Sequence, residues 1–532
     1  MAIAIDFGTS NTVIARWNPV TEKAETISLP HLSTVLGNNP PLIPSLVYVE
    51  NATQPQLALG QAVRDRGLDL SQDARFFQNF KRGIGTDVRG FMPELDGEII
   101  NFEQIGAWFL THIIQALKAN NWEVDALVFT VPVDSFEAYR HWLGQVCQSL
   151  QVDQVQMLDE PTAAALGYGL TEQDTLLVID FGGGTFDLAL VQLAQGHPQK
   201  RRPQGFILKW GEKLLAENSK QPTRTARVLA KAGQNLGGAD IDHWLIDYFT
   251  ANYSLNATPL TLRLAERLKI QLSSQNQASE VYFNDETLES YELKLDRDRF
   301  NQILRDKQFF ARLDEAMVQV LQQARRKGLE AGEIDAVLLV GGTAQIPAVQ
   351  DWVQQYFDQS KIRYQKPFEA IAQGALQLEQ GMEIKDFLYH SYGIRYWDRR
   401  HNCHNWHAII RQGQPYPMPD PVELVLGASA ENQPSIELIL GELGDEVGGT
   451  EVYFDGDRLV TRTLSSGNTQ VQPLNDREGA RTIAQLTPPG FPGRDRIKVL
   501  FQVDEQRFLR MTVEDLLTAE TLLEHQPVVQ LS

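Results

Sequence analysis

Two different patterns of hydrophobic and polar residues divide the chain. From residue 1 to about 385, short apolar runs alternate with longer stretches in which apolar residues recur every three or four positions. The short runs predict buried strands, and the longer stretches predict amphipathic helices. Strands are predicted over Ala2–Asp6, Thr12–Trp17, Ala126–Val131, Thr175–Asp180, Leu188–Leu193 and Ala336–Val340. Helices are predicted over Phe102–Asn120, Ser135–Ser149, Pro161–Gly167, Ile241–Ala251, Pro259–Ser273, Arg297–Lys327 and Ile346–Phe357. This alternation favours an α/β fold.

After about residue 390 the helical period nearly vanishes and strict alternation replaces it. In Arg496–Val503 the apolar residues fall on one face and Arg496, Lys498 and Gln502 fall on the other. A period of two indicates half-buried antiparallel strands. Further strands are predicted over Ser435–Gly441, Glu451–Phe454 and Phe508–Val513. We therefore predict a separate β-rich domain, with a boundary within Met382–Gly393.

Composition narrows the class of protein. A length of 532 residues with 42% hydrophobic residues predicts two to four packed units. The net charge of −20 argues against a nucleic-acid partner, because a polyanion would be repelled. The chain has two cysteines, no signal-peptide pattern and no apolar run of roughly twenty residues. These features favour a cytoplasmic protein without a membrane partner.

Two local features each leave two interpretations open. Gly196–Thr223 is a basic stretch within an acidic chain. It is interpreted either as a solvated insertion or as a docking surface for an acidic partner. In HNCHNWH, residues Cys403, His404 and His407 are candidate ligands of a soft metal. Their spacing fits no zinc template well, so a loop is the preferred interpretation.

One phrase occurs twice, as AIDFGTSNTVIARW from Ala4 and VIDFGGGTFDLALV from Val178. Each copy predicts a strand, a tight turn that begins with an aspartate, and a second strand. The Gly182–Gly184 run allows a ligand to approach the backbone closely, and consecutive N–H groups in such a turn bind anions. The first turn, Gly8–Asn11, adds hydroxyl and amide donors.

The doubled phrase differs from the common nucleotide-binding motifs. The chain contains neither G-x-x-x-x-G-K-[ST] nor G-x-G-x-x-G, and each turn leads into a strand and not into a helix. Two such hairpins predict two related lobes that grip one polyphosphate. Asp6, Asp180 and Asp187 would then hold Mg²⁺, mostly through water.

DFGTSNT, DFGGGTFD and AVLLVGGTAQIPAVQ resemble the actin-like ATPase superfamily and, more narrowly, the seventy-kilodalton heat-shock (DnaK-type) chaperones. ALVFTVPVDSFEAYR, MLDEPTAAALGYGL, NLGGADID and RLAERLKIQLSS agree in order and spacing. The resemblance implies a ribonuclease H-like ATPase domain over 1–384, with lobes of about 1–170 and 171–360 and a closing helix to 384. It also implies a linker over 385–395 and a β-sandwich over 396–532 without the helical lid of long members.

The resemblance implies a role for each residue that matches a family motif. Lys81, Glu160, Asp187 and Thr185 would act on the γ-phosphate, the metal and the attacking water. ATP or ADP would be bound by Gly8, Thr9, Ser10, Asn11, Gly182, Gly183, Gly184, Thr185, Gly237, Gly238, Glu266, Lys269, Ser273, Gly341, Gly342 and Thr343. Pro132, Arg140, Asp386 and Leu388 would relay the nucleotide state.

Several residues depart from the family pattern at the adenine site. Ile270 and Gln345 replace arginines, Phe368 replaces an acid and Ala239 replaces a glutamate. The loss of a stacking arginine predicts weaker ATP binding, by roughly 1–2 kcal/mol.

The resemblance implies an ATP-dependent chaperone whose slow hydrolysis changes its grip on unfolded polypeptide. Co-chaperones and nucleotide-exchange partners are implied with it. Two alternatives stay open. The first is a nucleotide-dependent scaffold that docks one dedicated partner, and the second is a small-molecule kinase of the same superfamily.

Overall fold

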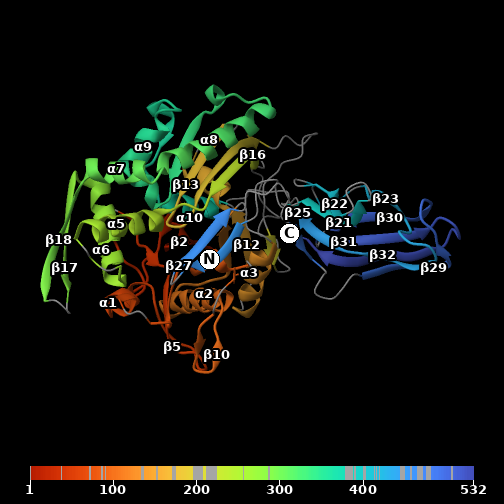
Figure 1. The fold of residues 1–532 in the computed structure, drawn as a ribbon, viewed down its shortest axis with the longest axis horizontal. Coiled ribbons are helices and arrows are strands. Elements are labelled where there is room, and N and C mark those ends of the chain that lie inside the picture. The colour runs from red at the N-terminus through yellow and green to blue at the C-terminus, as the bar shows by residue number, and fades with distance from the viewer. Residues whose placement is uncertain are drawn as a thin grey trace. The chain divides into compact units, whose positions relative to one another are not determined.

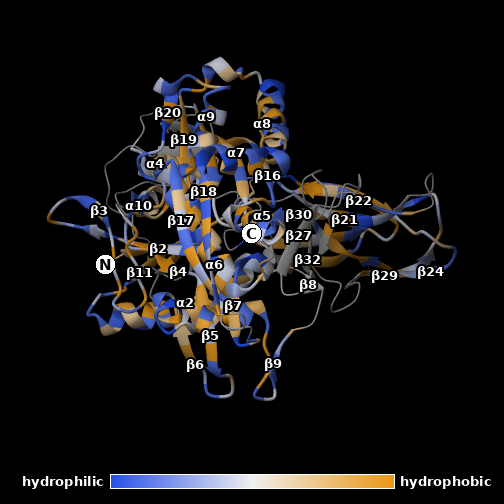
Figure 2. Ribbon diagram, turned by 60° about the vertical axis from the view of Figure 1, so that its left-hand side comes forward, coloured by the Kyte–Doolittle hydropathy of each residue, from blue (hydrophilic) through white to orange (hydrophobic). Residues whose placement is uncertain are grey.

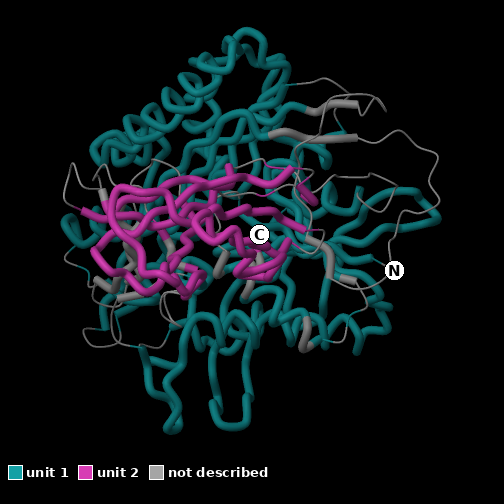
Figure 3. Tube along the Cα trace, turned by 90° about the vertical axis from the view of Figure 1, so that its right-hand side faces the viewer, with its two compact units in different colours: residues 1–384, 452–461 teal, residues 385–451, 462–532 magenta. Residues whose placement is uncertain are grey.

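The computed structural model describes most of the chain. It describes residues 2–531 except 38, 71–72, 86–87, 90–91, 133–136, 151, 153, 170–174, 196–207, 211–223, 254, 256, 285–287, 378–387, 389–390, 399–402, 412–413, 415, 419, 444–449, 456–457, 464–470, 475–480 and 505–506. The chain divides into two compact units. Unit 1 comprises residues 1–384 and 452–461, and unit 2 comprises residues 385–451 and 462–532 (Figure 3).

The first sheet of unit 1 is built around the N-terminal strand. Its strands are β1 (Ala2–Phe7), β2 (Asn11–Asn18), β3 (Lys23–Thr26), β4 (Ile43–Pro44), β11 (Ala126–Val131), β12 (Gln154–Asp159) and β15 (Leu208–Trp210). Their order is β15-β12-β11-β1-β2-β3, with β4 beside β2. The β1–β11 and β11–β12 pairs are parallel, whereas β1–β2 and β2–β3 are antiparallel.

The second sheet repeats this arrangement (Figure 1). Its strands are β13 (Thr175–Phe181), β14 (Phe186–Gln195), β16 (Arg224–Gln234), β19 (Ala336–Val340) and β20 (Ile362–Arg363). The β20–β19 and β19–β13 pairs are parallel, and the β13–β14 and β14–β16 pairs are antiparallel. The order β20-β19-β13-β14-β16 therefore matches β12-β11-β1-β2-β3, as expected for two related lobes.

Helices cover these sheets and connect them. The structure has α1 (Gln61–Asp65), α2 (Phe102–Ala119), α3 (Glu137–Ser149), α4 (Glu160–Gly167), α5 (Gly238–Tyr253), α6 (Pro259–Ser274), α7 (Arg297–Asp306), α8 (Phe309–Arg326), α9 (Pro347–Val353) and α10 (Glu369–Ala375). Their apolar faces follow the helical period, and α8 shows both hydrophobic and hydrophilic sides in Figure 2. Capping supports several starts: the Asn101 side chain accepts from Gln104 N, and Thr258 forms a capping box with Thr261.

Helices α4 and α10 cross with their backbones in contact. A Cβ atom built on Gly167 of α4 would lie 1.9 Å from the carbonyl oxygen of Ala370 in α10. A Cβ atom built on Gly374 of α10 would lie 1.8 Å from the carbonyl oxygen of Ala163 in α4. Each helix therefore requires a glycine at the point where the other passes, because any larger residue would collide with backbone atoms.

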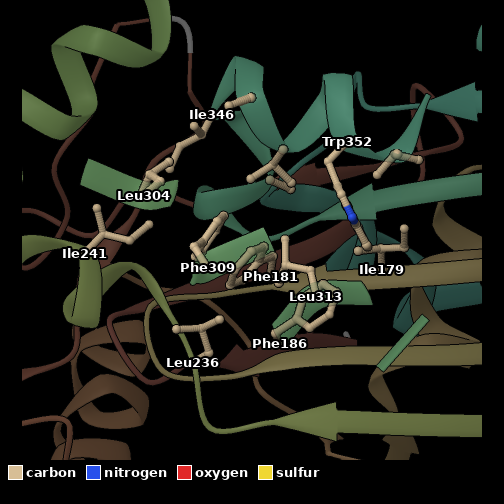
Figure 4. Close-up of a cluster of buried hydrophobic side chains, with 14 of the residues drawn as sticks. Ile179, Phe181, Phe186, Leu236, Ile241, Leu304, Phe309, Leu313, Ile346 and Trp352 are labelled. Atoms are coloured by element: carbon tan, nitrogen blue, oxygen red, sulfur yellow. The ribbon is translucent and has the colours of Figure 1, made fainter. Parts of the chain in front are cut away.

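The largest hydrophobic core of unit 1 lies on the second sheet (Figure 4). The rings of Phe181 and Phe186, on either side of the β13–β14 turn, have centroids 4.7 Å apart. Phe181 stacks on Phe309 at 5.7 Å, and Phe186 meets Trp352 edge-on at 5.9 Å. Such rings bury large apolar areas, so the base of this turn is fixed by aromatic packing from β13, β14, α8 and α9.

Short strands complete unit 1, and the last two of them extend slightly beyond its bounds. They are β5 (Leu46–Asn51), β6 (Gln56–Leu59), β7 (Phe76–Gln78), β8 (Val88–Arg89), β9 (Glu94–Leu95), β10 (Glu98–Ile99), β17 (Gln277–Asn284), β18 (Glu289–Asp296), β26 (Thr450–Asp455) and β27 (Arg458–Thr463). The β17–β18 hairpin stands at the left of Figure 1. The 3-10 turns are η1 (Leu68–Leu70), η2 (Phe80–Gly83), η3 (Ala331–Glu333), η4 (Gly342–Gln345) and η5 (Gln359–Lys361).

Unit 2 is built from strands alone in its described part. They are β21 (Ser391–Asp398), β22 (Cys403–Ile410), β23 (Val422–Gly427), β24 (Gln433–Leu438), β25 (Leu440–Leu443), β28 (Val471–Pro473), β29 (Arg481–Gly490), β30 (Asp495–Val503), β31 (Phe508–Asp515) and β32 (Thr521–Gln530). The sheets have the orders β22-β21-β25-β28, β23-β30-β31-β32 and β24-β29. Every second residue of β30 from Ile497 to Val503 is fully buried in the core, as the alternation predicts.

Four local predictions were wrong. The helix expected over Arg297–Lys327 is two helices, because Gln308 adopts a left-handed conformation with φ of 55°. The last helix ends at Val353 and not at Phe357. Arg496 was placed on the solvent face but is buried against Asp515, with Nη2 and Oδ2 2.8 Å apart. The preferred loop at Cys403–His407 is part of strand β22.

Two other predictions concern residues near the boundary and the insertion. Residues 391–395, expected in a linker, begin strand β21. The basic insertion lies outside the described residues apart from Leu208–Trp210, which pairs with β12.

Candidate active site

The first turn of the doubled phrase connects β1 and β2, and Ser45 holds it in place. Ser45 donates through its N–H to the Ser10 carbonyl at 2.8 Å and through Oγ to the Gly8 carbonyl at 2.8 Å. A Cβ atom on Gly8 would lie 2.2 Å from the Asn11 carbonyl oxygen, so this tight turn needs glycine there. Two carbonyl oxygens of the turn, those of Gly8 and Ser10, are therefore engaged by the protein.

The second turn connects β13 and β14, and its carbonyls are engaged in the same way. The Gly182 carbonyl accepts from Gly238 N at 3.1 Å and from Thr343 Oγ1 at 2.8 Å. The Gly183 carbonyl accepts from Ala239 N at 2.9 Å. Within the described residues, the N–H groups of Gly183 and Gly184 have no protein acceptor. Free N–H groups in a turn whose carbonyls are already bonded are suited to an anionic ligand.

The two turns lie directly against each other. A Cβ atom built on Gly183 would lie 1.9 Å from Ser10 Oγ, and one built on Gly184 would lie 2.9 Å from Thr9 Cγ2. Gly237, at the start of α5, lies equally close to the glycine turn, since its Cβ would be 2.3 Å from the Gly183 carbonyl oxygen. Thr185 is the last residue of the second turn, directly before β14. The structure thus brings together candidate residues from both copies of the phrase.

Partly buried carboxyl groups stand at the base of these turns. Asp6 is at the end of β1, where its Oδ1 accepts from Thr130 Oγ1 at 2.8 Å. Burial, followed by the charge of Glu160, raises the pKa of Asp6 to about 7. Asp180 and Asp187 are register partners on β13 and β14. Burial and then the charges of Glu160, Asp187 and Asp6 raise the pKa of Asp180 well above its ordinary value. A site with this excess of negative charge favours a cation.

Lys81 is the cation that the structure places among these acids. It lies in η2, and its Nζ is 3.1 Å from Oε1 of Glu160, the first residue of α4. Asp159 caps this helix by accepting from Thr162 N at 2.8 Å. Lys81 Nζ also lies 5.7 Å from the centroid of the Phe7 ring. Burial alone would lower the pKa of Lys81, but the charges of Glu160, Tyr139 and Asp6 together raise it, so the amine stays charged.

Arg82 belongs to the same site, although the sequence analysis did not single it out. Its Nη2 donates to the Gly184 carbonyl and lies 3.8 Å from Oδ2 of Asp240. Burial lowers the pKa of Arg82, and its Nε has no hydrogen-bond partner in the described structure. The sequence feature that could have identified Arg82 is its position directly after Lys81. Nothing in the local pattern shows that both side chains are buried.

The third glycine run approaches the acids from β19. Gly341 has a φ of 83°, and a Cβ atom there would lie 2.8 Å from Asp180 Oδ1. Both observations require glycine. Gly342 faces Phe368, whose ring atoms would lie 3.1 Å from a Cβ at that position. Phe368 therefore packs beside the glycine run, at the position where the family pattern has an acid.

The residues of α6 fall into two groups. Lys269 Nζ donates to the Gly238 carbonyl at 2.8 Å and to Asp242 Oδ2 at 2.7 Å, which places it beside the glycine turn. Glu266 instead pairs with Arg64 of α1 at 2.8 Å. Ser273 Oγ donates to the Lys269 carbonyl of its own helix, at 3.1 Å. Ile270 is 41% exposed.

The four candidate relay residues are divided between the two units, and the structure describes them only in part. Pro132 directly follows β11, and Arg140 lies within α3, where its side chain is outside the description. Asp386 is also outside the described residues. Leu388 is fully buried in the core of unit 2, where its N–H donates to the Gln414 carbonyl at 2.8 Å.

A metal ion would be held here indirectly. Among the described residues, no three His, Cys, Asp or Glu side chains converge closely enough to hold a metal, and this applies equally to Cys403, His404 and His407. In the acid cluster, Asp6 and Asp180 are partly buried carboxyl groups with raised pKa values. This donor set fits a hard cation that keeps its water shell, as Mg²⁺ does.

Comparison with protein families agrees with this geometry. No described helix has the length and apolarity needed to cross a membrane. A family model described as Hsp70 protein matches residues 41–201 and 225–392, which is more than half of the chain. The match is interrupted where the basic insertion lies and ends near the start of unit 2. Hsp70 proteins are ATPases of the actin-like superfamily, which confirms the predicted fold class of a two-lobed α/β part and a β-rich part. The chain belongs to the Hsp70 family.

Proposed function

We propose that this protein binds ATP with Mg²⁺ between its two lobes and hydrolyses it slowly, as a chaperone-like ATPase of the cytoplasm. One observation carries the proposal. Two glycine-containing turns from related sheets meet beside a largely buried Lys81–Glu160 pair and a cluster of aspartates. Phosphoryl transfer needs alignment and charge neutralisation more than covalent help, and these groups supply both.

Different residues of the site would bind the phosphates, the attacking water and the metal ion. The N–H groups of Gly183 and Gly184 would bind phosphate oxygens, with Thr9, Ser10 and Asn11 facing them from the first turn. Lys81 would neutralise charge on the terminal phosphate, while the Glu160 carboxylate would orient the attacking water. Asp6, Asp180 and Asp187 would hold Mg²⁺ through its water ligands, and the ion would supply charge neutralisation at the phosphates.

Lys269 would bind the nucleoside end of ATP, with the glycines that line it. The support is its position 2.8 Å from the Gly238 carbonyl, next to the turn that would hold the phosphates. Ile270, at 41% exposure, offers the base an apolar side chain and no charge. The base contacts would therefore be weaker than with a stacking arginine.

Unit 2 would bind extended polypeptide, and ATP would alter that binding. Antiparallel sheets of this kind bind peptides through strand-like backbone hydrogen bonds and side-chain pockets. A second candidate is the docking of one dedicated partner by unit 2. It is favoured by the end of the family match at residue 392, before most of the strands of this unit.

The test measures phosphate release from ATP by the purified full-length protein, with and without an unfolded peptide. We expect slow turnover that Lys81→Ala reduces by about 2–4 kcal/mol in the barrier, or roughly 30- to 1000-fold. Lys307→Ala is the matched control, because this lysine makes an exposed ion pair with Asp247 at 2.9 Å.

Equal turnover in the wild type and Lys81→Ala would contradict the ATPase proposal. Phosphate found on a small-molecule acceptor would establish a kinase. Binding of one partner, without affinity for unrelated unfolded peptides, would favour the scaffold.

A further inference from the structure

The side chain of Arg82 connects the first lobe to the glycine turn of the second. Arg82 belongs to η2, and its Nη2 donates to the carbonyl oxygen of Gly184 in the β13–β14 turn. A Cβ atom built on Gly184 would lie 2.6 Å from Arg82 Nε and 3.0 Å from Nη2, so glycine at this position leaves room for the guanidinium group. The Arg82 side chain is only 10% exposed. A hydrogen bond from a charged donor that is largely shielded from water is a strong one.

The backbone of η2 is held in the first lobe by aromatic packing. The ring of Phe80 is fully buried, and its centroid lies 6.0 Å from that of Phe7 in β1. A Cβ atom on Gly83 would lie 2.3 Å from the ring of Phe102, so η2 also lies directly against the start of α2. The side chain of Arg82 therefore reaches the second lobe from a base that is packed in the first.

The three glycine carbonyls of the second turn receive hydrogen bonds from different lobes. Those of Gly182 and Gly183 accept from residues of the second lobe, whereas that of Gly184 accepts from Arg82. A peptide group is planar and trans, so the direction of the Gly184 carbonyl also sets the direction of the Thr185 N–H. Because glycine adopts many backbone conformations, the orientation of this peptide depends on the bonds that hold it.

Asp240 provides a second contact between Arg82 and the second lobe. Its Oδ2 lies 3.8 Å from Arg82 Nη2 and accepts from Gly237 N at 2.8 Å. Gly237 in turn lies against the glycine turn, since a Cβ atom there would be 2.5 Å from Gly184 N. The guanidinium group is thus placed between the turn and the start of α5.

We propose that Arg82 is a positioning residue that fastens the first lobe to the glycine turn. It sets the orientation of the Gly184–Thr185 peptide, and it must leave the Gly184 carbonyl before the lobes can separate and release nucleotide. The second part of this inference rests on the proposed ATPase function, whereas the first part requires no nucleotide. Lys81, the preceding residue, stays within the first lobe through Glu160 at 3.1 Å. The two adjacent cations would therefore serve different purposes.

The first test measures hydrogen exchange of the full-length protein without nucleotide. The N–H groups of Gly238 and Ala239 donate to carbonyls of the glycine turn at 3.1 and 2.9 Å, so their exchange reports how firmly the turn is held. We expect Arg82→Met, which keeps an apolar stem and removes the donors, to speed their exchange about 10-fold. Arg82→Lys retains one charged donor and should restore part of the protection.

The second test measures the rate at which a fluorescent ADP analogue leaves the protein. We expect release from Arg82→Met to be about 10- to 100-fold faster than from the wild type, as for the loss of a hydrogen bond from a charged group. Arg82→Lys should again lie between the two. Arg325→Met is the matched control, because Arg325 is 59% exposed in an ion pair with Glu330 at 3.2 Å. It should change neither measurement.

Three results would overturn the inference. The first is equal exchange and equal ADP release in the wild type and Arg82→Met. The second is faster release with unchanged exchange at the start of α5, which contradicts the positioning of the turn. The third is faster exchange throughout unit 1 that lysine does not reverse, which shows general destabilisation. A wild-type protein that binds no ADP contradicts the proposed function and with it the role in release, and the exchange measurement then decides the positioning role alone.

Discussion

We expect a buried carboxyl group near the candidate site to make the stability of the protein depend on pH. Asp242 of α5 lies outside the two turns of the doubled phrase. Its Oδ2 accepts from Lys269, whereas its Oδ1 has no partner in the described structure. Burial raises the pKa of Asp242 to about 7, although Lys269 lowers it.

We expect Asp242→Asn to change how stability depends on pH. An aspartate in the unfolded chain titrates near pH ~4, so between about pH 4 and 7 the folded protein holds the additional proton. The contribution of Asp242 to stability is therefore lost as the pH rises through this window. The unfolding free energy of Asp242→Asn should rise relative to the wild type from pH 5 to 7, by an amount on the order of a few kcal/mol.

Denaturant unfolding at pH 5, 6 and 7 measures this difference. Asp247→Asn is the control, because the side chain of Asp247 is 49% exposed in its pair with Lys307. A parallel pH dependence of the wild type and Asp242→Asn would contradict the prediction.

For individual residues, the sequence predicts which motif residues lie close together, but not every other residue that contacts them. Ser10, Gly183, Asp180 and Gly341 lie together because each lies at or directly beyond the end of a strand, and the strand order follows from the repeat. Arg82 was missed because burial of a second cation is decided by its contact with Gly184 from the other lobe.

Among the secondary-structure elements, the crossing of helices α4 and α10 leads to a testable prediction. Gly167→Ala places a methyl group 1.9 Å from the Ala370 carbonyl oxygen. Backbone atoms on both helices must then move apart. We expect a loss of about 1–3 kcal/mol or more in unfolding free energy, as for overpacking in a core. Thermal unfolding measures it.

Gly332→Ala is the matched control for the crossing. No atom lies within 4 Å of a Cβ at this position in η3. Equal stability of the two variants would show that the helix crossing tolerates a side chain.

Errors in the predicted elements have physical causes that can be traced to particular residues. Leu304 and Phe309 are consecutive buried residues five positions apart, which breaks the helical period and coincides with the left-handed Gln308. The five-residue spacing of these two apolar residues could have been read from the sequence. The strand over Cys403–Ile410 was harder to predict. Its pairing with β21, and not its own polar composition, stabilises it.

The whole molecule has separate cores in its two units, each composed of residues from its own unit. We therefore expect calorimetry to resolve two unfolding transitions. ATP with Mg²⁺ should shift the transition of unit 1, because a ligand stabilises the state that binds it. Asp515→Ala should shift only the transition of unit 2, since it leaves Arg496 buried and unpaired at a cost of about 3–5 kcal/mol.

Glu514→Ala is the adjacent control for Asp515→Ala. Glu514 pairs with Lys498 at 3.0 Å on the exposed side of the same strands. Such a pair contributes at most about 1 kcal/mol. A single transition that both variants shift equally would contradict independent unfolding.

The reciprocal glycines of α4 and α10 also limit how the two lobes can move. Helices in backbone contact cannot approach further, so the motion left to them at this point is rotation about it. Glu160 begins the helix that Gly167 ends, and seven rises of about 1.5 Å separate them by roughly 10 Å. A rotation of about 10° would therefore move Glu160 by about 2 Å at that lever length. That displacement is enough to break its 3.1 Å contact with Lys81, so a small angular change at the helix crossing can open or close the Lys81–Glu160 ion pair.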